Sequence, residues 1–232
     1  MLNSRRLPRS VQISELLIRE ISSGLLADGT RLPTERKMAE HHGVAVGTLR
    51  KSLAILEDKG LLERVQGSGN YIRAKQKIDS VYALFRLELL NGGGLPTAKI
   101  LDIRAQPKAA SFPNFGASQT AHRITRLRYL DDKLIALEQI WLDSRFTKDI
   151  RKDDISESLY DYYKNELSLI ITRMEDKISL APVPDWTPDM FNMQAGDMAG
   201  YIERIGWDQF DRPAEFSKTW FNPKICHYVN RA

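Results

Sequence analysis

The segment LERVQGSGNYIR, Leu62–Arg73, sets two short runs of apolar and basic residues on either side of Gly67-Ser68-Gly69-Asn70. Glycine-rich loops cradle phosphates in nucleotide-binding enzymes, and they also form the tips of β-hairpins. A phosphate loop needs the spacing G-x-x-x-x-G-K-[ST] or G-x-G-x-x-G between a strand and a helix. Here the strand-like run Tyr71–Arg73 follows the glycines, so the sequence predicts a β-hairpin. Its tip is either an ordinary exposed turn or a point of close approach to DNA.

Two predicted helices lie upstream of this hairpin. In the first, from Ser10 to Gly24, apolar residues recur at helical spacing, and they are Ile13, Leu16, Leu17, Ile21 and Leu25. Thr34 begins the second, which extends to about His42, because the threonine hydroxyl can accept a hydrogen bond from an N–H of the first turn.

A third predicted helix extends from about Gly47 to Lys59 and directly precedes the hairpin. Its two faces differ: Leu49, Leu53 and Leu56 lie on one, and Gly47, Arg50, Lys51 and Ala54 on the other. Three helices followed by a β-hairpin are typical of a winged helix-turn-helix, whose third helix enters the major groove of DNA. Arg50 and Lys51 lie near the start of that helix, where groove contact requires them.

Charge is distributed unevenly along the chain. Residues 1–77 contain 14 Lys and Arg against 8 Asp and Glu, whereas residues 78–232 contain 20 against 22. A basic N-terminal third indicates a polyanionic partner, although a solvated surface of uneven charge has the same composition.

The segment GTRLPTERKMAEHHGVAVGTLRKSLAILEDKGLLERVQGSGNYI resembles the DNA-binding domain of the GntR family of bacterial transcription regulators, over residues 10–73. By this resemblance Arg36 and Arg50 contact bases or the nearby backbone, Arg31 and Thr34 contact phosphates, and Gly69 approaches the minor groove. The full set of expected DNA-binding residues is Arg31, Thr34, Arg36, Thr48, Arg50, Lys51, Gly67 and Gly69. Many members have Ser-Arg just before the third helix, where this chain has Ala45-Val46.

The rest of the chain reads mainly as strands. We expect strands at 97–105, 122–130, 134–142, 168–180, 200–207 and 214–221, with helices at 156–166 and 187–193. Leu159 and Tyr163 lie on the buried side of the first of these helices. The segment Ile78–Phe85 is either a strand or a helix, and Asn91-Gly92-Gly93-Gly94 ends it. The predicted organisation is a winged helix-turn-helix at 1–74, a linker at 75–96, and an α+β domain with an antiparallel sheet at 97–232.

This second domain resembles the UTRA domain, which marks the HutC subfamily of the same regulators. The segments that carry the likeness are RITRLRYLDDKLIALEQIWL, ISESLYDYY and YIERIGWDQFDRPAEFSKTWF. The resemblance implies the fold of chorismate lyase and a site for a small-molecule effector. It places Arg126, Arg128 and Glu138 at effector-contacting positions, with Arg204 and Glu215 as further members of the site. Family members often end in an Arg-containing segment, where this chain has Phe221-Asn222-Pro223.

The alternation of side chains supports a pocket independently. Arg126 and Arg128 share a strand face with Ile124, and Glu138 shares one with Ile140 and Leu142. If those apolar neighbours point inward, the charged groups line the interior and must pair with one another or with a ligand. Two arginines favour an anionic effector. Three aromatic residues, Tyr160, Tyr201 and Trp220, either stack on that ligand or belong to the core.

The sequence offers little for catalysis or metal binding. Cys226 and His227 are adjacent, so on a strand their side chains point to opposite faces. The four histidines are scattered, and no H-E-x-x-H or C-x-x-C spacing is present. We therefore expect no catalytic residue, metal or cofactor. A lyase-like activity or a partner-binding role of the second domain is the alternative to effector sensing.

The hydropathy pattern and the cysteine content indicate the compartment in which the protein works. No apolar run approaches the roughly 18 residues of a membrane span, and Cys226 is the single cysteine, as expected of a protein in a reducing compartment. We expect a cytoplasmic, ligand-responsive transcription regulator, a repressor that binds a near-palindromic DNA site as a homodimer.

Overall fold

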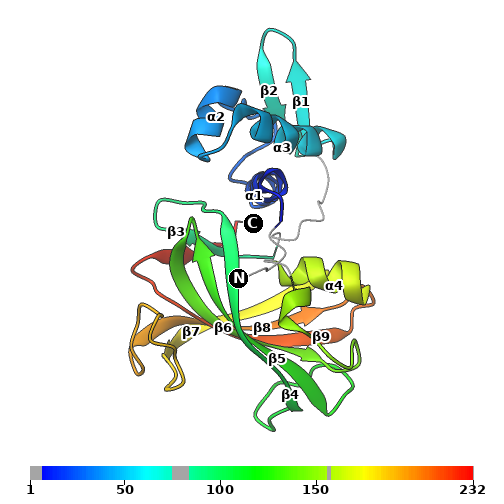
Figure 1. Ribbon diagram of the computed structural model, residues 1–232, viewed down its shortest axis with the longest axis vertical. Helices are drawn as coiled ribbons and strands as arrows, with labels where there is room; N and C mark the ends of the chain where they lie inside the picture. The colour runs from blue at the N-terminus through cyan, green and yellow to red at the C-terminus, as the bar shows by residue number, and fades with distance from the viewer. Residues whose placement is uncertain (1–6, 75–83, 156–157, 232) are drawn as a thin grey trace. The chain divides into compact units, whose positions relative to one another are not determined.

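The computed structural model of the chain describes residues 7–74, 84–155 and 158–231. The chain folds into two compact units, built mainly from Leu7–Arg86 and from Pro96–His227 (Figure 1).

The N-terminal unit contains three helices and a β-hairpin, as predicted. The helices are α1 (Arg9–Ser22), α2 (Glu35–His41) and α3 (Val46–Asp58), and the antiparallel strands of the hairpin are β1 (Leu62–Val65) and β2 (Gly69–Ile72). One hydrophobic core joins them, and its fully buried members include Ile18, Leu49, Leu53, Leu56 and Ile72. Figure 1 shows the hairpin projecting from the helical core. The unit is a winged helix-turn-helix.

The two helices of the helix-turn-helix begin differently. Thr34 caps α2 as predicted, since its hydroxyl accepts a hydrogen bond from the Lys37 N–H at 3.4 Å. Ala45 occupies the same position at the start of α3, with extended backbone and no side-chain cap. The first N–H groups of α3 therefore lack the partner that a hydroxyl at residue 45 would supply.

The C-terminal unit is built on one antiparallel sheet. Its six strands have the spatial order β4-β5-β6-β9-β8-β7, and their bounds are β4 (Pro96–Pro107), β5 (Thr120–Leu130), β6 (Lys133–Asp143), β7 (Arg173–Pro182), β8 (Met198–Trp207) and β9 (Pro213–Phe221). A short second sheet pairs β3 (Leu87–Leu89) with β10 (Cys226–Tyr228). This is the expected α+β architecture.

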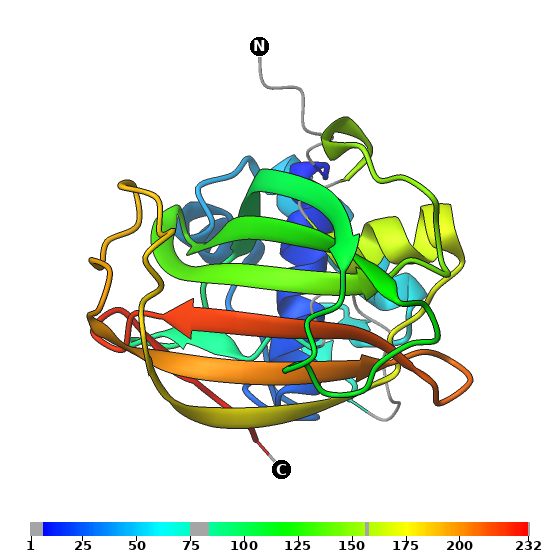
Figure 2. The same cartoon turned by 90° about the horizontal axis from the view of Figure 1, so that it is seen from below.

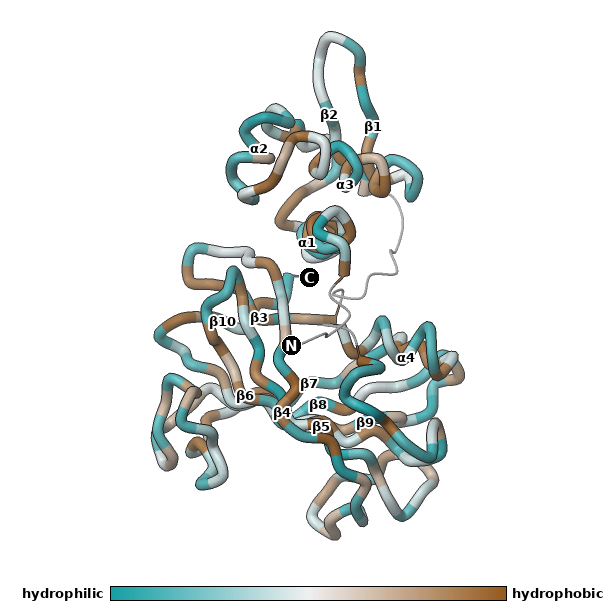
Figure 3. The backbone as a smooth tube through the Cα atoms, in the orientation of Figure 1, coloured by the Kyte–Doolittle hydropathy of each residue, from teal (hydrophilic) through white to brown (hydrophobic). Residues whose placement is uncertain are grey.

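The two faces of the large sheet are covered by different segments. Helix α4 (Leu159–Leu167), which follows a 3-10 turn at Lys152–Asp154, packs on one face against Ile124, Ile140 and Leu142 (Figure 2). On the opposite face Leu127, Leu137 and Trp220 pack against the connection between β7 and β8. Hydrophobic and hydrophilic segments alternate along the strands, as Figure 3 shows. The α4 face of the sheet contains the candidate effector residues.

Two predicted elements in this unit were wrong. The strand expected from Ser168 begins only at Arg173, because Ser168 has φ 52° and ends α4 in the left-handed conformation. No helix forms over 187–193. The Pro184 carbonyl accepts from the Thr187 N–H, and the Pro188 carbonyl accepts from the Phe191 N–H, so this segment forms successive turns. Pro188 has no N–H with which to continue a helix.

The segment expected to be a linker contains both described and undescribed residues. Most of Ile78–Phe85, expected as a strand or helix, lies outside the described residues. Farther along, β3 pairs with β10, and all three glycines of Gly92-Gly93-Gly94 have positive φ. The glycines follow β3, a strand that was not predicted from the sequence, and the element expected at Ile78–Phe85 stays a prediction.

Replacing Ala45 with Thr should stabilise the N-terminal unit by about 1 kcal/mol, because the hydroxyl supplies the missing cap of α3. The isosteric Ala45→Val change lacks the oxygen and is the control. Unfolding in urea, followed by circular dichroism at 222 nm, reports mainly this unit, which contains most of the described helical residues. All four tryptophans lie in the other unit, so their fluorescence gives an internal reference. Equal midpoints for the Thr and Val variants would contradict the prediction.

Candidate functional site

The expected DNA-binding residues of the helices lie at the surface of the N-terminal unit. Thr34 and Arg36 are exposed at the start of α2, and Arg50 and Lys51 are exposed near the start of α3, where Thr48 is half-buried. The leucines of α3 face the core, so its outer face is the polar one that the sequence predicts. The start of α3 can thus present guanidinium and ammonium groups to an external polyanion.

Arg50 is held in place by a neighbouring carboxylate. Its Nε lies 2.7 Å from Glu35 Oε2, and the other Glu35 oxygen lies 3.5 Å from Arg64 of the wing. Arg64 also pairs with Glu57 of α3 at 2.8 Å. The Arg50 side chain remains 65% exposed. Exposed pairs of this kind contribute only about 0–1 kcal/mol, so Arg50 can exchange Glu35 for a base edge at small cost.

The wing tip is joined to the segment before α2. The Arg31 guanidinium donates to the Ser68 carbonyl, and Arg31 forms an isolated bridge with Tyr71. Gly67 and Gly69 are exposed and have φ of 73° and 133°. A Cβ on Gly69 would lie 3.2 Å from Arg31 Nε. Arg31 and Gly69, both expected to contact DNA, therefore lie close together, and a side chain at residue 69 would crowd the Arg31 guanidinium.

The five expected effector residues lie on the α4 face of the large sheet. In the registers of the sheet, Arg126 is opposite Glu138, Glu138 is opposite Thr219, and Glu215 is opposite Gly206. Of the other two members of the set, Arg128 is buried and the Arg204 side chain is 13% exposed. Residues from four strands, far apart in the sequence, therefore form one charged cluster under α4.

Arg126 and Glu138 form the central ion pair of this cluster. Arg126 Nε donates to Glu138 Oε2 at 2.6 Å, and the Thr219 hydroxyl donates to Glu138 Oε1 at 3.3 Å. Burial alone would raise the pKa of Glu138, but the charges of Arg126 and Arg128 outweigh it and hold that pKa below its usual value. Glu138 is therefore ionised, and the internal pairing that the sequence allowed as an alternative is present.

Arg204 has a partner that the sequence did not indicate. It donates two hydrogen bonds to Asp176 of β7, at 2.6 and 2.8 Å, and both side chains are largely buried. Burial opposes the charge of Arg204, yet the Asp176 carboxylate raises its pKa above the usual value. Asp176 was missed because the pairing of β7 with β8 cannot be read from one sequence.

Glu215 differs from the other carboxyl groups. It is buried, and this burial raises its pKa, although the Tyr160 hydroxyl donates to Glu215 Oε1 at 2.7 Å and partly offsets the effect. Tyr163 faces the same carboxyl group without a hydrogen bond of good geometry. Burial likewise raises the pKa of Tyr160, so both tyrosines stay protonated. Glu215 is thus the carboxyl group of the cluster that is most easily protonated.

The cluster can accommodate a negative charge. Three guanidiniums, of Arg126, Arg128 and Arg204, face three carboxyl groups, of Glu138, Asp176 and Glu215. When Glu215 is protonated, one positive charge is in excess on a face with little water. Guanidinium groups there bind phosphate or carboxylate strongly. Among the aromatic candidates only Tyr160 joins this cluster, since Tyr201 and Trp220 pack together on the opposite face.

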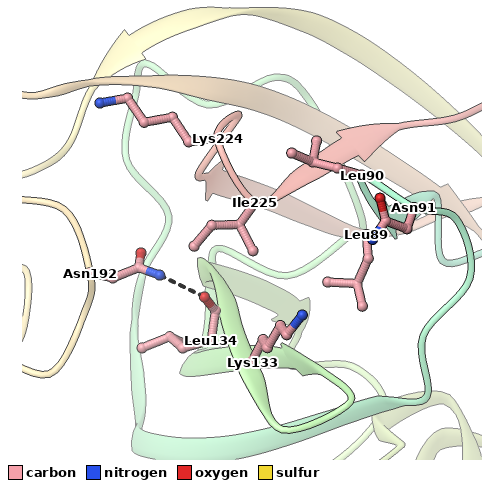
Figure 4. Close-up of a pocket in the computed structure, with 8 residues that line it drawn as sticks. All are labelled: Leu89, Leu90, Asn91, Lys133, Leu134, Asn192, Lys224 and Ile225. Carbon is pink, nitrogen blue, oxygen red and sulfur yellow. Dashed lines mark hydrogen bonds between the residues drawn. The ribbon is translucent and has the colours of Figure 1, made fainter.

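A separate pocket lies at the edge of the same unit (Figure 4). Its volume is about 540 Å³, and its lining residues are Leu89, Leu90, Asn91, Lys133, Leu134, Asn192, Lys224 and Ile225. Asn192 donates a hydrogen bond to the Leu134 carbonyl across it. It shares no residue with the charged cluster, and its two lysines are exposed rather than buried. Buried charge is the stronger sign of a specific site, so the cluster is the stronger of the two candidate sites.

The described part of the chain contains no group of three or more His, Cys, Asp or Glu side chains placed to hold a metal ion. None of its helices is long and apolar enough to cross a membrane.

Comparison with known proteins identifies relatives of both units. The model of bacterial regulatory proteins of the gntR family matches residues 9–72, and the UTRA domain model matches residues 92–226. The HTH-type transcriptional regulator SmoD of Agrobacterium fabrum is 51% identical over 225 residues, covering 97% of this chain and 96% of that protein. The HTH-type transcriptional repressor NagR of Bacillus subtilis is 24% identical over 233 residues, covering 97% and 96%.

A solved structure supports the fold. The structure of the possible transcriptional regulator YydK from Bacillus subtilis has a TM-score of 0.55 at 22% sequence identity, and the likeness covers 97% of this chain and 100% of that one. The two family models and the 51% identical relative confirm the resemblances inferred from the sequence.

The raised pKa of Glu215 predicts a pH-dependent effect of Glu215→Gln. Below the ordinary pKa of 4.5, wild-type Glu215 is neutral in both states, so the variant and wild type should become similarly stable as the pH falls toward and below that value. As the pH rises through the folded-state pKa, wild type must bury a charge and loses stability that the variant keeps. Urea unfolding followed by tryptophan fluorescence, between about pH 4.5 and 8, measures this difference.

Asp208→Asn is the matched control, because Asp208 is equally buried and its pKa is lowered: burial opposes the charge, but hydrogen bonds from Arg212 outweigh it. That variant should be less stable than wild type throughout this pH range, the opposite sign, and the deficit should disappear only as the pH falls below 3.8 and wild-type Asp208 is protonated. A Glu215→Gln variant that is less stable than wild type at pH 8 would contradict the assignment.

Proposed function

Because the chain belongs to the GntR family of bacterial regulatory proteins and carries a UTRA domain, we propose that it is a homodimeric repressor that a small anionic effector releases from a near-palindromic operator. Regulation of transcription, and not catalysis, is the activity that the family and the named relatives indicate. DNA and a small-molecule effector are the partners of such a regulator.

The proposal of an effector site rests on three arginines that share one sheet face: Arg126 and Arg128 are buried, and Arg204 is largely buried. Burying three guanidiniums costs free energy even when carboxylates pair with them, and apolar side chains of similar size would often serve stability as well. Their presence is explained if they recognise a ligand. A phosphate or carboxylate group fits the charge, and the Tyr160 hydroxyl and Glu215 suit the hydroxyl groups of the same molecule.

On the DNA side, α3 enters the major groove, and Arg50 reads a base there with Lys51 and Thr48 beside it. Arg50 leaves Glu35 and can bind guanine O6 and N7 with both ends of its guanidinium. Thr34, Arg36 and Arg31 hold the adjacent backbone, and the glycines at 67 and 69 let the wing tip approach the minor groove.

Coupling between effector binding and DNA binding requires two copies of the chain. A dimer presents two recognition helices with two-fold symmetry, which matches a near-palindromic site. Effector binding in the second unit favours a domain arrangement that no longer fits both half-sites, and so shifts the population away from the DNA-bound form. The protein acts in the cytoplasm, where its single free cysteine, Cys226, stays reduced and buried.

Arg50→Ala should weaken binding to the operator by about 1–3 kcal/mol, roughly 5- to 150-fold, and relax the preference at one base pair of each half-site. The operator is first selected from fragments of the source genome at roughly physiological salt. Lys59→Ala removes the same charge at the other end of α3 and is the control. A variant that keeps full sequence preference would exclude Arg50 as a base-reading residue.

Arg128→Gln should raise the effector concentration needed for operator release by at least about tenfold, because a buried charged hydrogen-bond donor is lost. The effector is identified from a panel of phosphorylated and carboxylated metabolites by release of labelled operator DNA. Lys224→Gln also removes one positive charge, but from the pocket of Figure 4, and should respond like wild type. If Lys224→Gln loses the response and Arg128→Gln keeps it, the effector binds in that pocket instead.

A further inference from the structure

The pocket of Figure 4, which is separate from the charged cluster, has the composition of a small-molecule site. Its volume of about 540 Å³ lies within the range of about 300–1,000 Å³ that is common for such sites. Half of the side chains that line it are apolar, and the other half are amides or ammonium groups. Among the described residues of this lining none is acidic. The pocket therefore suits a ligand with an apolar body and a negative charge.

Four segments that are far apart in the sequence form the pocket. They are the end of β3 with the turn after it, the start of β6, the connection between β7 and β8, and the segment between β9 and β10. Figure 4 shows side chains of all four segments around the pocket. Only the folded chain brings these segments together, as expected of a specific site.

Hydrogen bonds between asparagines hold the wall of the pocket in place. The Asn192 amide donates to the Leu134 carbonyl at 2.7 Å, and its oxygen accepts from Asn222 Nδ2 at 3.4 Å. Asn222 is buried, and its own side-chain oxygen accepts from the Lys224 N–H at 2.9 Å. The wall is thus formed before a ligand arrives, which lowers the cost of binding. Asn222 belongs to Phe221-Asn222-Pro223, where the chain departs from the family pattern.

The apolar side chains of the pocket are incompletely buried. Leu90 is 47% exposed, and Leu89, Leu134 and Ile225 are half-buried. Removing apolar surface from water is favourable. An apolar group that covers these side chains therefore gains affinity.

Two ammonium groups flank the apolar side chains, and the protein itself does not neutralise them. Within the described part of the chain neither Lys133 nor Lys224 forms an ion pair, and the Asn91 amide forms no hydrogen bond. Figure 4 shows the ammonium of Lys133 turned toward the side of Leu89 and that of Lys224 turned outward at the rim. Lysine stems are flexible, so both ammonium groups can reach an anion at the rim.

The small sheet beside the pocket connects the two units along the chain. Strand β3 begins directly after Arg86, which belongs to the N-terminal unit, and β10 ends at Tyr228, which also belongs to that unit. The Val229 N–H donates to the Arg86 carbonyl at 2.8 Å, so the two connections are bonded to each other. A ligand in contact with Leu89 and Ile225 therefore adjoins both connections.

We propose that this pocket is a second ligand site, which binds a small organic carboxylate with an apolar body, and that its occupant changes the affinity of the chain for DNA. The carboxylate pairs with Lys133 and Lys224, and the apolar body covers Leu89, Leu134 and Ile225. A sugar phosphate suits the pocket poorly, because hydroxyl groups placed on those side chains lose their hydrogen bonds to water. The effect on DNA rests on the proposed regulator, whereas binding of the carboxylate does not.

The first experiment titrates the full chain with two fluorescent dyes. Anilinonaphthalene sulfonate is an apolar anion, and phenylnaphthylamine has the same ring system without the charge. The anion should bind at one site per chain, at least about threefold more tightly than the neutral dye. The double variant Lys133→Gln/Lys224→Gln should abolish this difference and leave the affinity for the neutral dye unchanged. Hexanoate should displace the anionic dye from wild type.

Lys177→Gln is the matched control. It removes the same charge from an exposed lysine of β7, next to Ile178, which is 52% exposed. Dye bound to that apolar surface instead would respond to this variant. All of the replaced lysines are exposed, and circular dichroism at 222 nm confirms that each variant is folded.

The second experiment measures the affinity for the selected operator with and without hexanoate, at a concentration that displaces the dye completely. In wild type the dissociation constant of the operator should change at least about threefold. In the double variant Lys133→Gln/Lys224→Gln the same concentration of hexanoate should have no effect.

The outcomes separate the claims. A preference for the anionic dye that only the double variant abolishes supports the site. Equal binding of the two dyes by wild type, or a preference that the double variant keeps, overturns it. Displacement of the dye by the effector found in the metabolite panel shows one ligand instead of two and overturns the second site. Bound hexanoate that leaves operator affinity unchanged overturns the effect on DNA. A chain without sequence-specific DNA binding overturns the proposed function, while the dye titration still decides the site.

Discussion

The register between β5 and β6 is the constraint on which the candidate effector site depends. The turn between them consists of Asp131 and Asp132, both at positive φ, which sets Leu130 opposite Lys133. Continued without change, that register would set Arg126 opposite Leu137. One extra residue of β6 is inserted where the register shifts between Arg128 and Tyr129, and it moves Glu138 into place opposite Arg126. A slip of one residue would turn Glu138 to the other face of the sheet.

The same register explains why the charges are tolerated. Glu138 receives hydrogen bonds from Arg126 and Thr219 on the two neighbouring strands, so the carboxylate is satisfied on both sides. Asp176 and Arg204 satisfy each other in the next pair of strands. Glu215 has the Tyr160 hydroxyl and a raised pKa, so its proton can leave or remain according to what binds nearby. The charges of Glu138, Asp176 and Arg204 are thus satisfied within the cluster, and Glu215 is the group whose charge is set least firmly.

The N-terminal unit was predictable from sequence because its determinants are local. Helical spacing, the Thr34 cap and the glycines of the wing each act within a few residues, and each is found where expected. The sheet faces near Arg126 and Glu138 were predictable for the same reason, since alternation along one hairpin decides them. Asp176 and Glu35 were missed because their partners, Arg204 and Arg50, are 28 and 15 residues away and are brought near only by tertiary structure. The absence of a helix at 187–193 depends on prolines and on packing of Phe191 against the sheet.

Arginine is used in two contrasting ways in this chain, and the contrast follows from burial. Arg50 is exposed and only weakly held by Glu35, so water and salt already screen the pair and DNA can replace the carboxylate at little cost. Arg126 and Arg204 are buried and held by short bonds, so removing their partners would leave costly unpaired charge. An exposed guanidinium suits a partner that must bind and leave readily. A buried set suits a ligand that must be told apart from others, because only a group of matching charge and shape can enter without a large loss of free energy.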